Sequence, residues 1–173
     1  DLKNISQNHI LMADLVLNHI SSSHPWVQQF INSQEPGISN VLSPDHNLDW
    51  TDVVRPRSSS LFSNVNTKDG PKHFWTTFGP DQIDLNWHNP KMTIYFLSII
   101  ITYLTHGVKW FRLDAVGFIW KESGTTCLHL PKAHSIVKIL RILLNNLLSD
   151  GLLITETNVP QKENLSYLVP EDE

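Results

Sequence analysis

Three apolar runs along the chain have the length of strands, and each of them ends in polar residues. They are ILMADLVLNH (10–19), VKWFRLDA (108–115) and LLITET (152–157). Continuous apolar runs of this length are typical of strands that are buried in a parallel sheet. The polar residues at the three C-terminal ends are therefore expected to lie at one edge of that sheet.

Two segments with helical spacing separate these strands. Lys91–His106 predicts a helix that ends at Gly107, and Pro131 opens a second helix that ends before Asp150 and Gly151. Strands that alternate with helices predict an α/β fold built from βα units. The second helix has one apolar face, formed by Ile136, Val137, Leu140, Leu143, Leu144 and Leu147.

The segment between the first strand and the first of these helices has no clear periodicity. Residues 20–87 are rich in Pro, Ser, Asn, Asp and aromatic residues. Long irregular connections are uncommon in compact domains unless they are functional, so we expect an inserted lobe here. The predicted division places residues 1–19 and 88–173 in the main body and residues 20–87 in the lobe.

Composition and charge exclude several classes of function. The 173 residues include 13 Lys+Arg and 17 Asp+Glu, with a formal net charge of −4 and no basic run, so nucleic acid is not an expected partner. The apolar stretch Met92–Leu104 is shorter than the roughly 20 residues of a membrane-spanning helix. One cysteine, Cys127, fits a reducing compartment, and the first residues lack a signal-peptide pattern. We therefore expect a soluble, cytoplasmic protein with no membrane partner.

Two carboxylates stand at the ends of consecutive predicted strands, Asp114 and Glu156. Cleavage of a glycosidic bond uses such a pair, one ionised and one protonated. Arg112 precedes Asp114 by two residues, so both side chains point to the same side, and its charge would keep Asp114 ionised. Glu156 has no basic neighbour in its strand, which favours a raised pKa and the role of acid. By spacing alone, a purely structural role for the two acids is an open alternative.

Four short motifs follow one another along the chain. They are DLVLNH (14–19), QIDLN (82–86), FRLDAVGFIWK (111–121) and TETN (155–158). In this order they resemble signature regions of the α-amylase superfamily, glycoside hydrolase family thirteen, over nearly the whole chain. Longer phrases such as WTTFGPDQIDLNW and GTTCLHLPK are similar to its sucrose phosphorylase-like branch, which includes glucosylglycerate phosphorylases and related glycosyl phosphorylases.

The resemblance implies a catalytic role for three residues. Asp114 matches the nucleophile, Glu156 the general acid/base, and Arg112 the arginine that orients the nucleophile. The mechanism implied is retaining: a covalent glucosyl-enzyme forms on Asp114 and is then resolved by an acceptor.

Four further residues are expected to bind the substrate. By the resemblance, His19 hydrogen-bonds the sugar in the cleaved subsite, Phe78 is an aromatic platform from the inserted lobe, and Gln82 is a polar contact beside it. An aromatic face against the apolar face of a pyranose shields a forming cation. Phe118 would complete that wall, with packing as an equal alternative.

No metal and no cofactor are expected. Asn18 and Asp84 match calcium-ligand positions of many α-amylases, but the phosphorylase-like branch generally lacks that metal, and calcium needs six to eight oxygen ligands. Asp14, early on its strand, is expected to be a structural partner for a base inside the barrel. Inorganic phosphate would be a co-substrate.

The fold that the resemblance implies is a partial (β/α)8 TIM barrel, about strands 3–5, with the irregular lobe inserted after the third strand. A full barrel takes about 250 residues. The expected function is retaining α-glucosyl transfer from a small glycoside, such as sucrose or glucosylglycerate, to phosphate. The alternatives are an α-glycosidase that hydrolyses sucrose, and a truncated remnant without catalysis. The sequence indicates no oligomeric state.

Overall fold

The computed structural model describes residues 2–45, 47–157, 159 and 164–168. Contacts between residues group the chain into two compact units. The sheet unit consists of the residues up to Leu17, Thr93–Gly117, and those from His129 onward, and the loop-rich unit consists of Asn18–Met92 and Phe118–Leu128. Asn158, the last residue of the motif TETN, lies outside the described residues.

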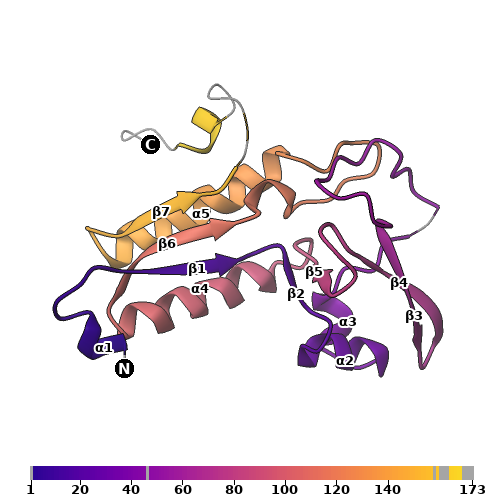
Figure 1. The fold of residues 1–173 in the computed structure, drawn as a ribbon, viewed down its shortest axis with the longest axis horizontal. Coiled ribbons are helices and arrows are strands. Elements are labelled where there is room, and N and C mark those ends of the chain that lie inside the picture. Colours follow the sequence, from indigo (N-terminus) through magenta and orange to yellow (C-terminus); the bar gives the residue numbers. More distant parts are fainter. Residues whose placement is uncertain (1, 46, 158, 160–163, 169–173) are drawn as a thin grey trace. The chain divides into compact units, whose positions relative to one another are not determined.

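Three parallel strands form the sheet of the sheet unit, in the order β1-β6-β7 (Figure 1). They are β1 (Leu11–Val16), β6 (Val108–Asp114) and β7 (Leu152–Thr155), and they confirm the three predicted strands. Within the described residues the sheet is open. This arrangement is that of a part of a (β/α)8 barrel, as predicted.

The first strand is shorter than predicted. The sequence predicts one strand over residues 10–19, but β1 ends at Val16, and β2 (His19–Ser21) pairs antiparallel with β5 (Gln82–Asp84). The chain leaves the parallel sheet because Asn18 is buried and bound in the loop-rich unit. Its carbonyl accepts the Leu85 N–H (2.8 Å), and its side-chain amide donates to Asp84 Oδ2 (2.9 Å).

The two predicted helices are α4 (Lys91–Thr105) and α5 (Pro131–Leu147). Tyr103 of α4 contacts Phe111 of β6, with 6.3 Å between the ring centroids. Leu147 was expected on the buried face of α5, but it is the last residue of the helix and is 51% exposed. None of the helices in the described part of the chain has the length and hydrophobicity that a membrane span requires. Short helices are also present at α1 (Leu2–Ile5), η1 (Val116–Phe118) and η2 (Leu165–Tyr167).

The two faces of the sheet differ in burial. Phe111 and Leu113 of β6 are fully buried, as expected for side chains beneath helices. In each strand, the side chains that alternate with the buried ones lie on the opposite face of the sheet, which carries the charged residues. Large apolar side chains on that face are exposed, namely Met12, Val16, Leu152 and Ile154. The catalytic candidates of β6 therefore lie on the open face of the sheet.

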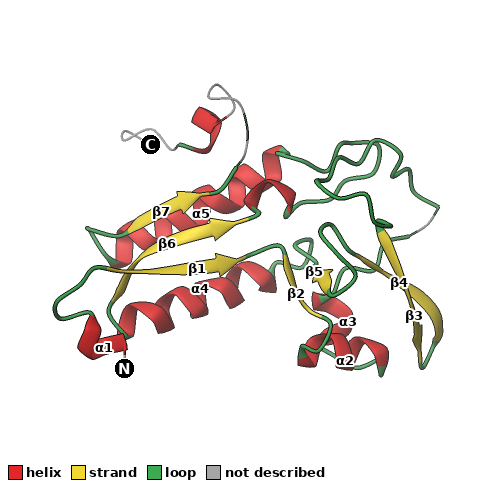
Figure 2. Cartoon of the chain, viewed as in Figure 1, coloured by secondary structure: helices red, strands yellow, loops and turns green. Residues whose placement is uncertain are grey.

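The loop-rich unit contains two short two-stranded antiparallel sheets and long irregular connections, drawn green in Figure 2. Besides the pair of β2 and β5, β3 (Phe62–Thr67) pairs antiparallel with β4 (Gly70–Trp75). Two short helices, α2 (Pro25–Ile31) and α3 (Gly37–Asn40), pack with these strands. Its small core consists of Val27, Phe30, Val41, Phe74 and Ile83.

Candidate active site

The two candidate catalytic carboxylates come from neighbouring strands at the same edge of the sheet. Asp114 is the last residue of β6, and Glu156 directly follows β7. The Glu156 N–H donates to the Leu113 carbonyl at 3.1 Å, which extends the β6–β7 ladder to this point. The ladder therefore places Glu156 beside Asp114, and both carboxyl groups lie against Arg112.

Arg112 joins these carboxylates to a third one, Asp14 of β1. Its Nη1 donates to both oxygens of Asp14, at 2.8 and 2.6 Å, and its Nη2 lies 2.8 Å from Glu156 Oε2. The contact of Arg112 with Asp114 is longer, 3.3 Å. Asp14 stands directly opposite Arg112 in the β1–β6 register, which explains the close pair. Asp14 is thus the structural partner of a base, as its position on the strand predicts.

The pKa directions of the pair are the reverse of those expected from sequence. Burial and the hydrogen bond from Glu156 raise the pKa of Asp114 to about 6. The hydrogen bond with Asp114, together with Arg112, lowers the pKa of Glu156. The physical reason is that the guanidinium lies closer to Glu156 than to Asp114, while Asp114 is the more buried of the two, with its side chain 25% exposed against 39%. Of the two carboxyl groups, Asp114 is therefore the one that keeps its proton up to the higher pH.

The backbone after Asp114 takes part in the same group. Ala115 has a φ of 53°, in the left-handed region that residues other than glycine rarely adopt. A hydrogen bond from the Ala115 N–H is also among the causes that lower the pKa of Glu156. Strained backbone at such a place is typical of functional sites, where the surrounding structure maintains it.

The four predicted substrate-binding residues gather in the loop-rich unit. The ring centroids of His19 and Phe78 are 5.2 Å apart, and those of Phe78 and Phe118 are 5.3 Å apart. Gln82 Nε2 donates to His19 Nε2 at 2.9 Å. The structure thus brings all four together, but their roles in sugar binding stay predictions.

His19 has a hydrogen-bonding group to offer. Burial lowers its pKa, so the imidazole is neutral at neutral pH. Because Nε2 accepts from Gln82, the ring proton lies on Nδ1. That nitrogen is buried and has no hydrogen-bond partner among the described residues. A buried donor without a partner is costly, and a sugar hydroxyl would satisfy it.

A buried ion pair in the loop-rich unit was missed by the sequence analysis. Lys121 Nζ lies 2.8 Å from Asp84 Oδ2, and the side chains are 4% and 0% exposed. The ammonium also donates to Asn18 Oδ1 at 3.1 Å and to the Phe118 carbonyl. Asn18 and Asp84 are the two residues that match calcium-ligand positions, so their oxygens already surround an internal cation. The signal that could have indicated this ion pair is the position of Lys121 at the end of the motif FRLDAVGFIWK.

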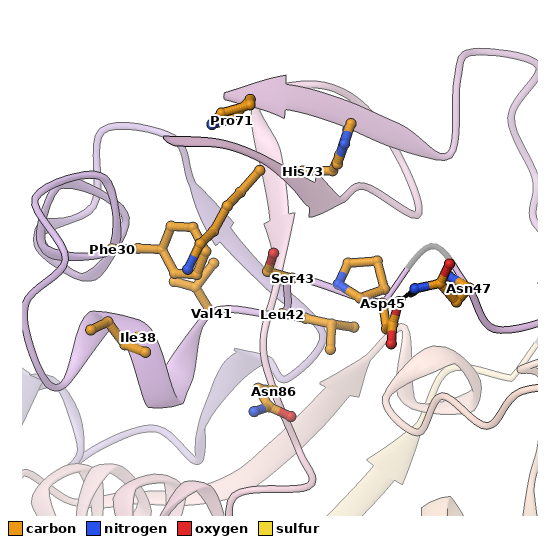
Figure 3. A pocket seen from close by; sticks show the side chains of 12 residues that line it. Phe30, Ile38, Val41, Leu42, Ser43, Asp45, Asn47, Pro71, His73 and Asn86 are labelled. Carbon is orange, nitrogen blue, oxygen red and sulfur yellow. Dashed lines mark hydrogen bonds between the residues drawn. The ribbon is translucent and has the colours of Figure 1, made fainter. Parts of the chain in front are cut away.

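Among the described residues, neither a metal-binding cluster nor a cavity adds a candidate for the active site. Within the described residues, no group of three or more His, Cys, Asp and Glu side chains could hold a metal ion. A cavity of about 530 Å³ lies in the loop-rich unit (Figure 3). It is lined mainly by Phe30, Ile38, Val41, Leu42, Ser43, Asp45, Asn47, Lys72, His73 and Asn86. None of the predicted site residues lines it, so it is distinct from the predicted sugar contacts.

The parallel βα arrangement carries paired carboxylates at the carboxyl edge of its strands, the edge at which barrel enzymes have their active sites. The model of the α-amylase catalytic domain matches residues 3–173, and the chain therefore belongs to the α-amylase family. Since its relatives are glycoside phosphorylases and other enzymes of this family, it is an enzyme by family.

Two of the relatives within this family are glucosylglycerate phosphorylases. The chain is 44% identical over 167 residues to the glucosylglycerate phosphorylase of Allomeiothermus silvanus. The matched region covers 96% of this chain and 30% of the relative. The chain is 40% identical over 169 residues to the glucosylglycerate phosphorylase of Escherichia coli, with the same two coverages. The chain thus spans about a third of the length of these relatives. A crystal structure of sucrose 6F-phosphate phosphorylase from Thermoanaerobacter thermosaccharolyticum has the same fold, with a TM-score of 0.78 and 24% identity over 90% of this chain and 35% of that one.

Proposed function

We propose that the protein carrying this chain is a retaining α-glucosyl phosphorylase that acts on a small glycoside, with glucosylglycerate as the foremost candidate and sucrose as the second. The observation that carries the proposal is the pair of Asp114 and Glu156 at the edge of the sheet, both in contact with Arg112. The names of relatives at 40% and 44% identity support phosphate as the acceptor and glucosylglycerate as the donor.

In the first step, one Asp114 oxygen attacks the anomeric carbon of the glucosyl unit. The bond from that carbon to the leaving oxygen breaks, and Glu156 gives its proton to that oxygen. In the second step, a phosphate oxygen attacks the same carbon, the bond to Asp114 breaks, and Glu156 takes the proton of the attacking phosphate. The product is glucose 1-phosphate with retained configuration at the anomeric carbon.

The first step needs the proton on Glu156 and not on Asp114. The two carboxyl groups influence each other's pKa, so an ionised Asp114 favours the proton on Glu156. A positive charge that moves towards Asp114 would favour its ionised form. Arg112, whose contact with Asp114 is the longest of its three pairs, is the group that can supply this charge when the substrate is bound.

The substrate side of the proposal uses the loop-rich unit. The buried Nδ1 of His19 would donate to a sugar hydroxyl, and Phe78 would cover the apolar face of the pyranose. Gln82 fixes the His19 ring, and Phe118 supports Phe78 through an edge contact. No metal takes part in the proposed steps.

The test is to incubate the protein, in its full natural length, with glucosylglycerate or sucrose, each with and without phosphate. The expected result is glucose 1-phosphate that forms only with phosphate present, and faster from glucosylglycerate. Free glucose released at the same rate in both cases, with no glucose 1-phosphate, would refute phosphorolysis and leave a glycosidase. No conversion of either glycoside would indicate a protein without this activity.

A further inference from the structure

The loop that follows Asp114 is bound to one histidine, His129. The chain turns at Ala115 and continues to Gly117, whose carbonyl accepts the His129 N–H at 2.8 Å. The imidazole lies directly against this glycine, since a Cβ at Gly117 would come within 2.7 Å of His129 Nδ1. The backbone contact therefore depends on the absence of a side chain at position 117.

The segment that follows Glu156 returns to the same histidine. Thr157 Oγ1 donates to Asn164 Oδ1 at 2.8 Å, immediately before η2. At the end of η2, Tyr167 is 6% exposed, and its Oη lies 2.6 Å from His129 Nδ1. Burial raises the pKa of Tyr167, so its hydroxyl keeps the proton that it needs as a donor. One hydrogen bond thus connects the segment that follows Asp114 with the segment that follows Glu156.

A second histidine holds the tyrosine from the first turn of α5. The rings of His134 and Tyr167 stack with 4.0 Å between their centroids. His134 Nε2 lies 3.2 Å from the His129 carbonyl and donates to it. His129 itself has a φ of 52°, which its several contacts maintain. Several contacts therefore hold His129 and Tyr167 in place, as expected for residues that fix the position of neighbouring segments.

We propose that His129 and Tyr167 are positioning residues, which hold the segments after Asp114 and Glu156 together and so align the two carboxyl groups. This inference rests on the proposed function, because the reacting pair is assigned there. The link to the chemistry is that Asp114 and Ala115 begin the loop that His129 holds, while the Glu156 N–H donates to the Leu113 carbonyl just before that loop at 3.1 Å. The Ala115 N–H also lowers the pKa of Glu156 through a hydrogen bond. The other groups that face Glu156 are Asp114 and Arg112 of β6, and Asp14 of β1 pairs with Arg112.

The test removes one hydroxyl, in Tyr167→Phe of the full-length protein. A loosened pair of segments misaligns the carboxyl groups, so kcat should fall about tenfold while KM changes less than about twofold. The Glu156 carboxyl, followed by ¹³C NMR, should titrate at higher pH than in the wild type, because the Ala115 N–H stabilises its charge less. Tyr103→Phe is the matched control: the same change on α4, where the ring packs on Phe111, should alter neither quantity.

Two variants of His129 separate positioning from folding. Asn accepts the left-handed backbone and offers a side-chain oxygen where Nδ1 lies, so His129→Asn should keep more than half of kcat. His129→Leu should lose about tenfold or more. A lower melting temperature with unchanged kcat and unchanged Glu156 titration, in both Tyr167→Phe and His129→Leu, would overturn the inference. If the wild type makes no glucosyl-enzyme, the proposed function fails, whereas the Glu156 titration still decides whether the two residues position it.

Discussion

Lys121→Met tests whether the buried ion pair of the loop-rich unit holds that unit together. Met fills a similar volume but carries no charge, so the Asp84 carboxylate, which is fully buried, loses its cation. Three donors to Asp84 remain: Asn18 Nδ2 at 2.9 Å, the Thr77 N–H at 3.0 Å and Thr77 Oγ1 at 2.6 Å. Removal of one partner of a buried pair typically costs about 3–5 kcal/mol. The three remaining hydrogen bonds place the expected loss at the lower end, about 3 kcal/mol.

The matched control is Lys109→Met. Lys109 Nζ is even closer to its partner, 2.6 Å from Asp150 Oδ2, but the two side chains are 44% and 58% exposed. An exposed pair contributes little to stability because water screens it. If distance decided, Lys109→Met would lose more stability than Lys121→Met, whereas burial predicts the larger loss for Lys121→Met. Urea denaturation of the chain, followed by tryptophan fluorescence and circular dichroism, gives both free energies of unfolding. Equal losses for the two variants, or a smaller loss for Lys121→Met, would refute the reasoning.

Three further predictions concern the sheet unit. The Asp114 carboxyl should titrate near pH 6 in ¹³C NMR. Because its folded-state pKa is raised from 3.8, this group contributes stability at pH below 3.8, and the contribution is lost as the pH rises through about 6. Asp114→Asn should abolish this part of the pH dependence of unfolding, and a midpoint near 4 would contradict the structure. Glu156→Gln should turn over an α-glucosyl donor with a very acidic leaving group far better than glucosylglycerate, since only the latter needs a proton; equal losses on both donors, by initial rates, would exclude Glu156 as the acid. Gly117→Ala should destabilise the chain by about 1–3 kcal/mol in urea denaturation, because its Cβ would overlap the His129 ring; a neutral effect would place the ring elsewhere.

The elements that the sequence predicted well are those with strong patterns. The three apolar runs and the two periodic helices appear in the structure within a few residues of their predicted bounds, except that the first strand ends early. Its end depends on Asn18, whose bonds to Asp84 and Leu85 come from residues more than 60 positions away in the sequence. Periodicity within the strand carries no information on such partners.

The positions of the two carboxylates could also be predicted, because each follows an apolar run directly. The direction of their pKa shifts could not. It depends on the β1–β6 register, which sets Asp14 opposite Arg112 and so draws the guanidinium away from Asp114. The spacing of Arg112 and Asp114 within one strand carries no information on which residue of the neighbouring strand faces them. The ammonium of Lys121 escaped notice for the same reason, since its three oxygen partners are distributed along the chain.

The most direct test of the proposed chemistry is to trap the glucosyl-enzyme. The Glu156→Gln variant of the full-length protein, mixed with α-glucosyl fluoride, should form the intermediate without needing an acid and should resolve it slowly without a base. Digestion and mass spectrometry should then find one glucosyl unit on the peptide that contains Asp114, and fragmentation should place it on that side chain. The same treatment of the Glu156→Gln/Asp114→Asn double variant should give no adduct. A glucosyl unit on any other residue, or turnover of the fluoride with inversion and without an adduct, would contradict the assignment of Asp114 as nucleophile.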